Sequence, residues 1–218
     1  MATASWPYGM TPVHFLRMKL PPATDATTLP DQGFRHHAPF WWGNAIVVTL
    51  EGAGLAVLVF AYFYVWRSFD TWPPTGTKVP DLGVSTIDVA VLVVSILPML
   101  YVAHLALRFE RPRVLGLWLL VCVVFGFTAA ILRVMEFKGV HTRWNNAYGT
   151  IVWAILLVHF AHIVAATLEA LVLGILMLRG PVNDLHFVDV TRNAIYWYFV
   201  ALSWVGLYVM VFLGPRFM

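Results

Sequence analysis

The sequence predicts an all-α integral membrane protein, a bundle of five transmembrane helices preceded by an extended N-terminal arm. Of its 218 residues, 60% are hydrophobic and only 11% are charged, and the mean hydropathy is +0.76. Soluble domains carry about 25% charged residues. Five apolar stretches are each long enough to cross ~30 Å of hydrocarbon as a helix. Strands of a membrane barrel would be about 10 residues long with alternating polarity, whereas these stretches are longer and continuously apolar, which favours helices.

The five expected spans follow one another with short connections. They cover residues 45–66, 87–107, 114–135, 151–178 and 194–213. The segment before them contains Pro21, Pro22 and Pro30, which disfavour regular helix, so it is expected to be extended. We therefore divide the chain into an arm (1–43) and a five-helix transmembrane domain (44–218).

Ionisable side chains interrupt the first three spans. A charge at bilayer depth costs about 2.5 kcal/mol or more, so each such residue is a functional hypothesis by default. Glu51 lies inside the first span, and Asp88 and His104 lie near the two ends of the second. Glu136 follows Arg133 by one helical turn at the end of the third span, which predicts an ion pair on one helix face. His104 beside a basic loop is equally well explained as an ordinary interfacial histidine.

The fourth span carries His159, His162 and Glu169 on one stripe of a helix. Imidazoles at i and i+3 can share a metal, and transmembrane histidines also ligate haem. A metal or haem site would need further ligands from other helices, and His104 is the one histidine that another span offers. Hydrogen bonding to neighbouring helices or to a lipid headgroup is the competing interpretation, and it predicts no metal in this chain.

The distribution of Lys and Arg predicts a cytoplasmic N-terminus, because basic residues favour the cytoplasmic side. That orientation places eight basic residues near the spans inside and five outside, and the short loop with Arg108, Arg111 and Arg113 contributes most. The net charge of +3 is explained by this topology, so no nucleic-acid partner is expected. The single cysteine, Cys122, can form neither an internal disulfide nor a thiolate metal cluster.

The order of motifs along the chain resembles subunit III of the haem–copper terminal oxidases. Trp72-Pro73-Pro74-Thr75-Gly76 matches that family's Trp-Pro-Pro-Thr-Gly, and Tyr148-Gly149 leads at the family's spacing into His159-Phe160-Ala161-His162. The segment 196–204 keeps the family's aromatic frame in Trp197 and Trp204. Tyr198 and Ala201 replace the family's histidine and aspartate there, and the similar word His186-Phe187-Val188-Asp189 lies before the expected span.

The resemblance implies a short, five-helix bacterial form in the cytoplasmic (inner) membrane. It implies a non-redox subunit without catalytic residues or metal, which binds phospholipid, supports proton uptake and contacts oxidase subunits I and II, where haem and copper reside. Cytochrome c and quinol stay open as electron donors. The implied lipid- or proton-related buried polar residues are Glu51, His104, Glu136, His159, His162 and Glu169. The implied structural residues are Trp72, Pro73, Pro74, Tyr148, Gly149, Trp197 and Trp204.

Two alternative functions belong to other classes. An accessory subunit of a nitric-oxide reductase has a similar five-helix form, and Tyr198 and Ala201 are departures that fit such a branch. A stand-alone membrane haem or metal enzyme would use His159 and His162, with Glu169 on the same stripe. A visible spectrum of the isolated subunit distinguishes the second alternative from the others.

Overall fold

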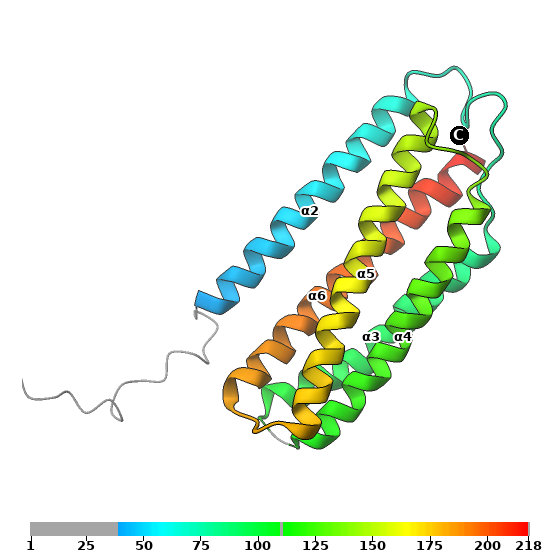
Figure 1. Ribbon diagram of the computed structural model, residues 1–218. Helices are drawn as coiled ribbons and strands as arrows, with labels where there is room; N and C mark the ends of the chain where they lie inside the picture. The colour runs from blue at the N-terminus through cyan, green and yellow to red at the C-terminus, as the bar shows by residue number, and fades with distance from the viewer. Residues whose placement is uncertain (1–38, 110, 218) are drawn as a thin grey trace, which may run out of the picture. The chain divides into compact units, whose positions relative to one another are not determined.

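The protein is a bundle of long helices, and the computed structural model describes residues 39–109 and 111–217 (Figure 1). The helices are α2 (Pro39–Trp66), α3 (Gly83–Leu107), α4 (Pro112–Gly139), α5 (Ala147–Arg179) and α6 (Asp184–Tyr208), which continues into η3 (Val209–Leu213) and η4 (Gly214–Arg216). All five long helices are sufficiently long and apolar to cross a membrane, and the described part contains no strand. The predicted all-α, multi-pass membrane fold is confirmed.

Several helices begin earlier than hydropathy predicts. Helix α2 starts at Pro39, so the last residues of the predicted arm (1–43) are helical, while residues 1–38 lie outside the described part. Helix α6 starts at Asp184, ten residues before the predicted 194. The Asn183 side chain accepts a hydrogen bond from the His186 backbone N–H, and His186 Nδ1 accepts one from the Asn183 N–H. This reciprocal cap starts the helix within polar sequence, where hydropathy gives no signal.

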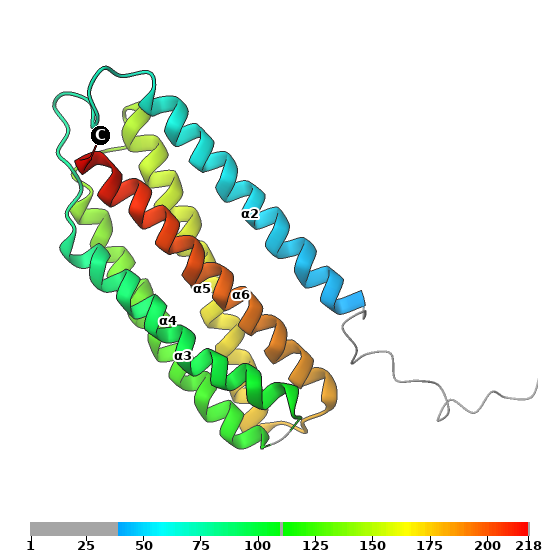
Figure 2. The same cartoon turned by 180° about the vertical axis from the view of Figure 1, so that it is seen from behind.

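Helices α3 to α6 form the core of the bundle, and α2 lies outside it. Within the core, α4 packs against α3 and α5, and α6 packs against the same two helices from the other side. Helix α2 runs along α5 and α6, as both views show (Figure 2). Only 11% of the apolar stretch of α2 is buried, against 39% to 44% for the other four spans. The outer helix therefore presents most of its apolar surface to lipid or to a partner.

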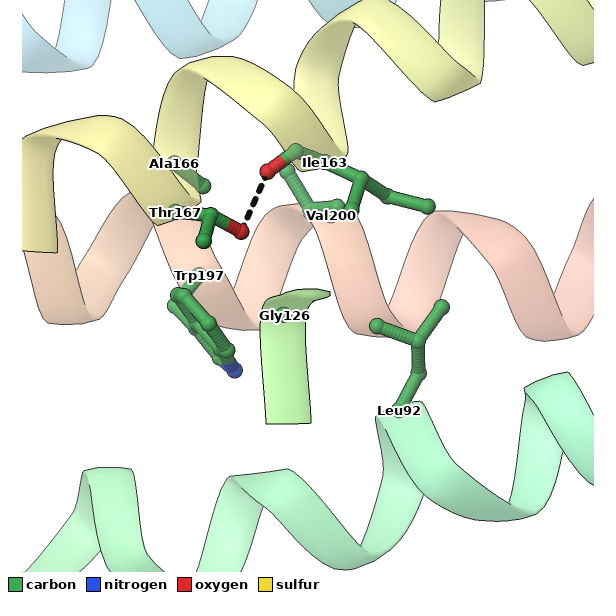
Figure 3. Close-up of a pocket in the computed structure, with 7 residues that line it drawn as sticks. All are labelled: Leu92, Gly126, Ile163, Ala166, Thr167, Trp197 and Val200. Atoms are coloured by element: carbon green, nitrogen blue, oxygen red, sulfur yellow. Dashed lines mark hydrogen bonds between the residues drawn. The ribbon is translucent and has the colours of Figure 1, made fainter. Parts of the chain in front are cut away.

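Glycines set the close packing of α4 against α5. A Cβ at Gly126 would lie 2.1 Å from Oγ1 of Thr167, whose hydroxyl donates to the Ile163 carbonyl at 2.7 Å. Small residues allow helix backbones to approach closely in membranes, where van der Waals packing drives association. A cavity of about 10 Å³ remains beside this contact (Figure 3). It is lined by Leu92, Gly126, Ile163, Ala166, Thr167, Trp197 and Val200.

The motif after α2 anchors the end of that helix. The Trp72 indole N–H donates to the Tyr62 hydroxyl at 3.0 Å, and the Tyr62 hydroxyl donates to the Met210 carbonyl at 3.2 Å. The Trp72 ring also contacts Tyr148 edge to face at 4.8 Å. Pro73 and Pro74 continue the loop, and the Pro74 carbonyl accepts from the Thr77 hydroxyl at 2.6 Å. These contacts connect α2 with α5 and with the C-terminal turn.

Gly149 has a specific reason to be glycine. Its N–H donates to the side chain of the N-cap residue Asn146 at 2.6 Å, which begins α5. A Cβ at Gly149 would lie 1.9 Å from the Arg143 carbonyl oxygen. The preceding loop therefore crosses the first turn of α5 too closely for any side chain.

Gly126→Ala is expected to destabilise the bundle. The added methyl would overlap Thr167, and inserting a methylene into a packed core typically costs about 1–3 kcal/mol. The measurement is thermal unfolding of the purified chain in detergent, followed by circular dichroism.

Gly54→Ala is the matched control for this substitution, because no atom lies within 4 Å of a Cβ at Gly54. The control is expected to leave the melting temperature unchanged or slightly raised, since alanine favours helix. Equal melting temperatures for the two variants would contradict the packing argument.

Candidate functional site

Polar side chains within the membrane-spanning helices form several separate groups. The first is the Arg133 cluster, formed by Asp88 of α3, Arg133 and Glu136 of α4, His159 of α5 and Trp204 of α6. Each of these five residues is at most 2% exposed. The cluster therefore connects all four core helices through side chains that are sealed from lipid.

The Arg133 guanidinium has a partner on each side and a ring above it. Its Nη2 lies 2.7 Å from Asp88 Oδ2, and its Nη1 lies 2.8 Å from Glu136 Oε2. Its central carbon lies 3.3 Å from the centroid of the Trp204 ring, a cation–π contact. The ion pair predicted between Arg133 and Glu136 is confirmed, and Asp88 completes it from the neighbouring helix.

His159 is oriented through both ring nitrogens. Its Nε2 lies 2.9 Å from the Val200 carbonyl, which can only accept, so Nε2 carries a proton. Its Nδ1 lies 3.3 Å from Arg133 Nη2, which can only donate, so Nδ1 is the acceptor. The ring stacks on Trp204 with centroids 4.8 Å apart. This pattern describes a neutral imidazole that uses both nitrogens in the packing of α4, α5 and α6.

The second group is the Glu51 cluster, formed by Glu51 of α2, His162 of α5 and Tyr196 of α6. His162 Nε2 lies 3.4 Å from Glu51 Oε2, and the Tyr196 side chain interacts with the Glu51 carboxyl group. The Phe199 ring lies next to this group, with its centroid 6.1 Å from that of the His162 ring. Tyr196 is buried and His162 is half-buried, while 31% of the Glu51 side chain is exposed. This cluster joins the outer helix to the core.

Glu169 belongs to a third contact. It accepts a hydrogen bond from Asn193 of α6 at 3.1 Å, and the same amide donates to the Ala166 carbonyl at 3.3 Å. At 100° per residue, His162 and Glu169 lie within about 20° of each other around α5, and His159 is about 60° away. The residues of the predicted stripe therefore lie in two different environments: His159 is in the core, and His162 faces α2.

The histidines do not share a binding geometry. The rings of His159 and His162 are 6.4 Å apart and meet nearly perpendicular. Among the described residues, no group of three or more His, Cys, Asp or Glu side chains could hold a metal ion. The separated rings give no geometric support to a single metal ion shared by His159 and His162.

The prediction of six buried polar residues was wrong in part. Glu136 and His159 are buried, whereas Glu51, His162 and Glu169 are half-buried and His104 is exposed on α3. The reason is that hydropathy locates a residue along the membrane normal and not around the helix. In a span that is apolar on every side, a polar residue gives no indication of which face enters the core.

Some residues of the site were not assigned a role from the sequence. Asp88 was noted only by its position, and its place inside an apolar run was the available signal. Tyr196 and Asn193 gave none, because aromatic and amide residues are common near membrane interfaces. Ser95 accepts a hydrogen bond from the Trp197 indole at 2.9 Å, which explains why this tryptophan lies in the core.

A groove lies beside the Glu51 cluster, between α2 and α6. It has a volume of about 400 Å³ and an apolar lining. Its lining residues are Gly52, Leu55, Ala56, Val59, Phe60, Ser203, Gly206 and Leu207. The small residues Gly52, Ala56 and Gly206 leave this space between the two helices.

Comparison with known proteins identifies the family. A family model described as "Cytochrome c oxidase subunit III" matches residues 38–214. A cytochrome c oxidase subunit 3 from Thermostichus vulcanus is 25% identical over 180 residues, 80% of this chain and 87% of that protein. Those from Squalus acanthias and Balaenoptera musculus are 26% and 24% identical over 143 residues, 65% of this chain. The chain spans 54% of the length of these two relatives. With the family model covering nearly all of the described helices, the chain belongs to the cytochrome c oxidase subunit III family.

Proposed function

We propose that this chain is a non-redox subunit of a proton-pumping haem–copper terminal oxidase in a bacterial inner membrane. In this role it contacts subunits I and II, which carry the haem and copper and reduce O₂ to water. The family match over residues 38–214 is the observation that carries the proposal. The N-terminus lies on the cytoplasmic side, as the basic loop between α3 and α4 favours.

The surface of α2 supports a role within a larger complex. Its span is the least buried of the five, and large apolar side chains such as Leu50, Val57, Phe60 and Tyr64 are at least 65% exposed. In a membrane, such a surface contacts either acyl chains or the helices of another subunit. The protein therefore acts as a scaffold that presents apolar helix faces to its neighbours.

The groove between α2 and α6 is suited to an acyl chain. Its lining is apolar except for the Ser203 hydroxyl, which donates to the Val200 carbonyl, whereas the Glu51 cluster next to the groove supplies a carboxyl group and an imidazole. A phospholipid tail in the groove would fill the space that Gly52 and Gly206 leave open. Lipid in this position stabilises the contact between α2 and the core.

Glu51 and His162 provide the polar part of this seam. Their contact at 3.4 Å holds an ionisable pair at the junction of α2 and α5. In the proposed oxidase this pair supports proton uptake by the catalytic subunit and protects it from inactivation during turnover. No residue of this chain acts on O₂ or carries electrons.

Purification of the tagged chain in mild detergent tests the proposal. We expect the oxidase subunits I and II to co-purify, with a reduced-minus-oxidised visible spectrum of haem that is lost when the partners are stripped away. Phospholipid is expected to remain with the isolated chain. A haem spectrum that follows the isolated chain, or co-purification with a nitric-oxide reductase in place of an oxidase, would contradict it.

Glu51→Gln is expected to leave the assembled complex intact and to shorten its catalytic lifetime severalfold. Glutamine keeps the size of the side chain and its ability to form hydrogen bonds but cannot ionise, so it removes the charge and the titratable proton. The measurement is O₂ consumption by the purified oxidase until activity is lost. Asp70→Asn is the control, because it removes a carboxyl charge from an exposed position in the loop after α2, outside the Glu51 cluster. An unchanged lifetime would remove Glu51 from this function.

Gly206→Leu is expected to reduce the number of phospholipids that co-purify with the chain. A Cβ at Gly206 meets no atom within 4 Å, so the leucine side chain has room to occupy the groove without displacing protein. Native mass spectrometry measures the retained lipids. Gly54→Leu is the control, since Gly54 also has an open Cβ position but does not line the groove. Equal lipid retention in the two variants would contradict lipid binding between α2 and α6.

A further inference from the structure

The Arg133 cluster contains one more acidic group than its basic groups can neutralise. Asp88 and Glu136 are both in contact with the single guanidinium of Arg133. The titratable side chain that α5 adds is His159, which is neutral in the hydrogen-bonding pattern above, and α6 adds the uncharged ring of Trp204. With both carboxyl groups ionised, the cluster would carry a net charge of −1 at positions that are at most 2% exposed.

A buried, uncompensated charge is strongly unfavourable, and the usual solution is that one group becomes neutral. Binding of one proton from water to one carboxylate would make this cluster neutral. His159 is a poor recipient, because a proton on Nδ1 would replace an acceptor by a donor facing Arg133. The proton therefore belongs on one of the two carboxyl groups.

The two carboxyl groups each have an oxygen available for a proton. Oδ1 of Asp88 and Oε1 of Glu136 are buried and accept no hydrogen bond among the described residues. Their other oxygens contact Arg133 at 2.7 and 2.8 Å. A protonated carboxyl group in either position would keep its contact with the guanidinium, so access to water decides between them.

Of Asp88 and Glu136, only Glu136 lies beside a pocket, and its carboxyl oxygens themselves are buried. It lines a pocket of about 320 Å³ at the start of α3 and the end of α4, together with Asp81, Val84, Ser85 and Lys138. This end of the helices lies at the membrane boundary, where the Asp81 N–H donates to the Gly139 carbonyl at 3.0 Å. At the rim, Asp81 also pairs with His141 at 2.8 Å, and both side chains are exposed. Asp88 does not line the pocket.

We propose that the Arg133 cluster is a proton-binding site, in which Glu136 holds one proton and exchanges it with water through the pocket beside Ser85. Asp88 and Arg133 set the charge that makes the proton necessary, and His159 contacts the same guanidinium nitrogen as Asp88. Asp81, Lys138 and His141 are the titratable groups at the entrance. The inference uses only this chain's own residues and does not depend on the proposed oxidase role.

Infrared spectroscopy of the full chain in lipid nanodiscs tests the proposal. A protonated carboxyl group gives a C=O stretching band apart from the amide bands, and the band shifts when water is replaced by D₂O. We expect Glu136→Gln to remove one such band and Glu136→Asp to retain it at a shifted position. Asp88→Asn is also expected to remove it, because the cluster is then neutral without a bound proton.

Controls separate this site from the other membrane carboxyl groups. Glu51→Gln and Glu169→Gln are expected to leave the band in place. A band that survives Glu136→Gln, or one that survives Asp88→Asn, would overturn the charge argument. Val84→Phe fills part of the pocket that Glu136 also lines, while the Glu136 carboxyl group is kept, and it is expected to slow the exchange into D₂O severalfold. An unchanged exchange rate in that variant would overturn the proposed path.

Discussion

The buried Arg133 guanidinium is the constraint on which the arrangement of the core helices depends. An ion of this kind cannot be left unpaired in a medium without water, and removing one partner of a buried pair costs about 3–5 kcal/mol in proteins generally. Its partners come from three other helices: Asp88 from α3, His159 from α5 and the Trp204 ring from α6. These contacts together restrict how α3, α4, α5 and α6 can be placed relative to one another.

Packing alone would not specify that placement as strongly. Lipid tails are as apolar as the side chains of the bundle, so no hydrophobic force distinguishes one apolar helix face from another within the membrane. Steric fit between α4 and α5 adds a further constraint. The Thr167 side chain packs against Gly126, where the side chain of any other residue would overlap it. The polar contacts constrain the relative orientation of the helices, since each hydrogen-bond donor must face an acceptor. Steric fit and these polar contacts together specify how the core helices pack.

Helix α2 is attached to the bundle differently from the core helices. Little of its apolar stretch is buried, so it is available to lipid or to another subunit. It contributes no residue to the Arg133 cluster; Tyr62 and Trp72 hold one end of it, and the contact of Glu51 with His162 joins it to α5. The apolar groove next to this seam leaves part of the interface unfilled by protein. Lipid, or the helices of a larger complex, can fill the part of the α2 interface that this protein leaves open.

By itself the sequence determined that the chain has five membrane-spanning helices and that Arg133 pairs with Glu136. Continuous apolar runs and the helical period suffice for these, because each is a local property. Only the tertiary structure decided that Asp88 faces Arg133, that His159 and His162 have separate surroundings, and that His104 is exposed. The physical reason is that these spans are apolar all round, so the sequence contains no amphipathic signal for the face that enters the core.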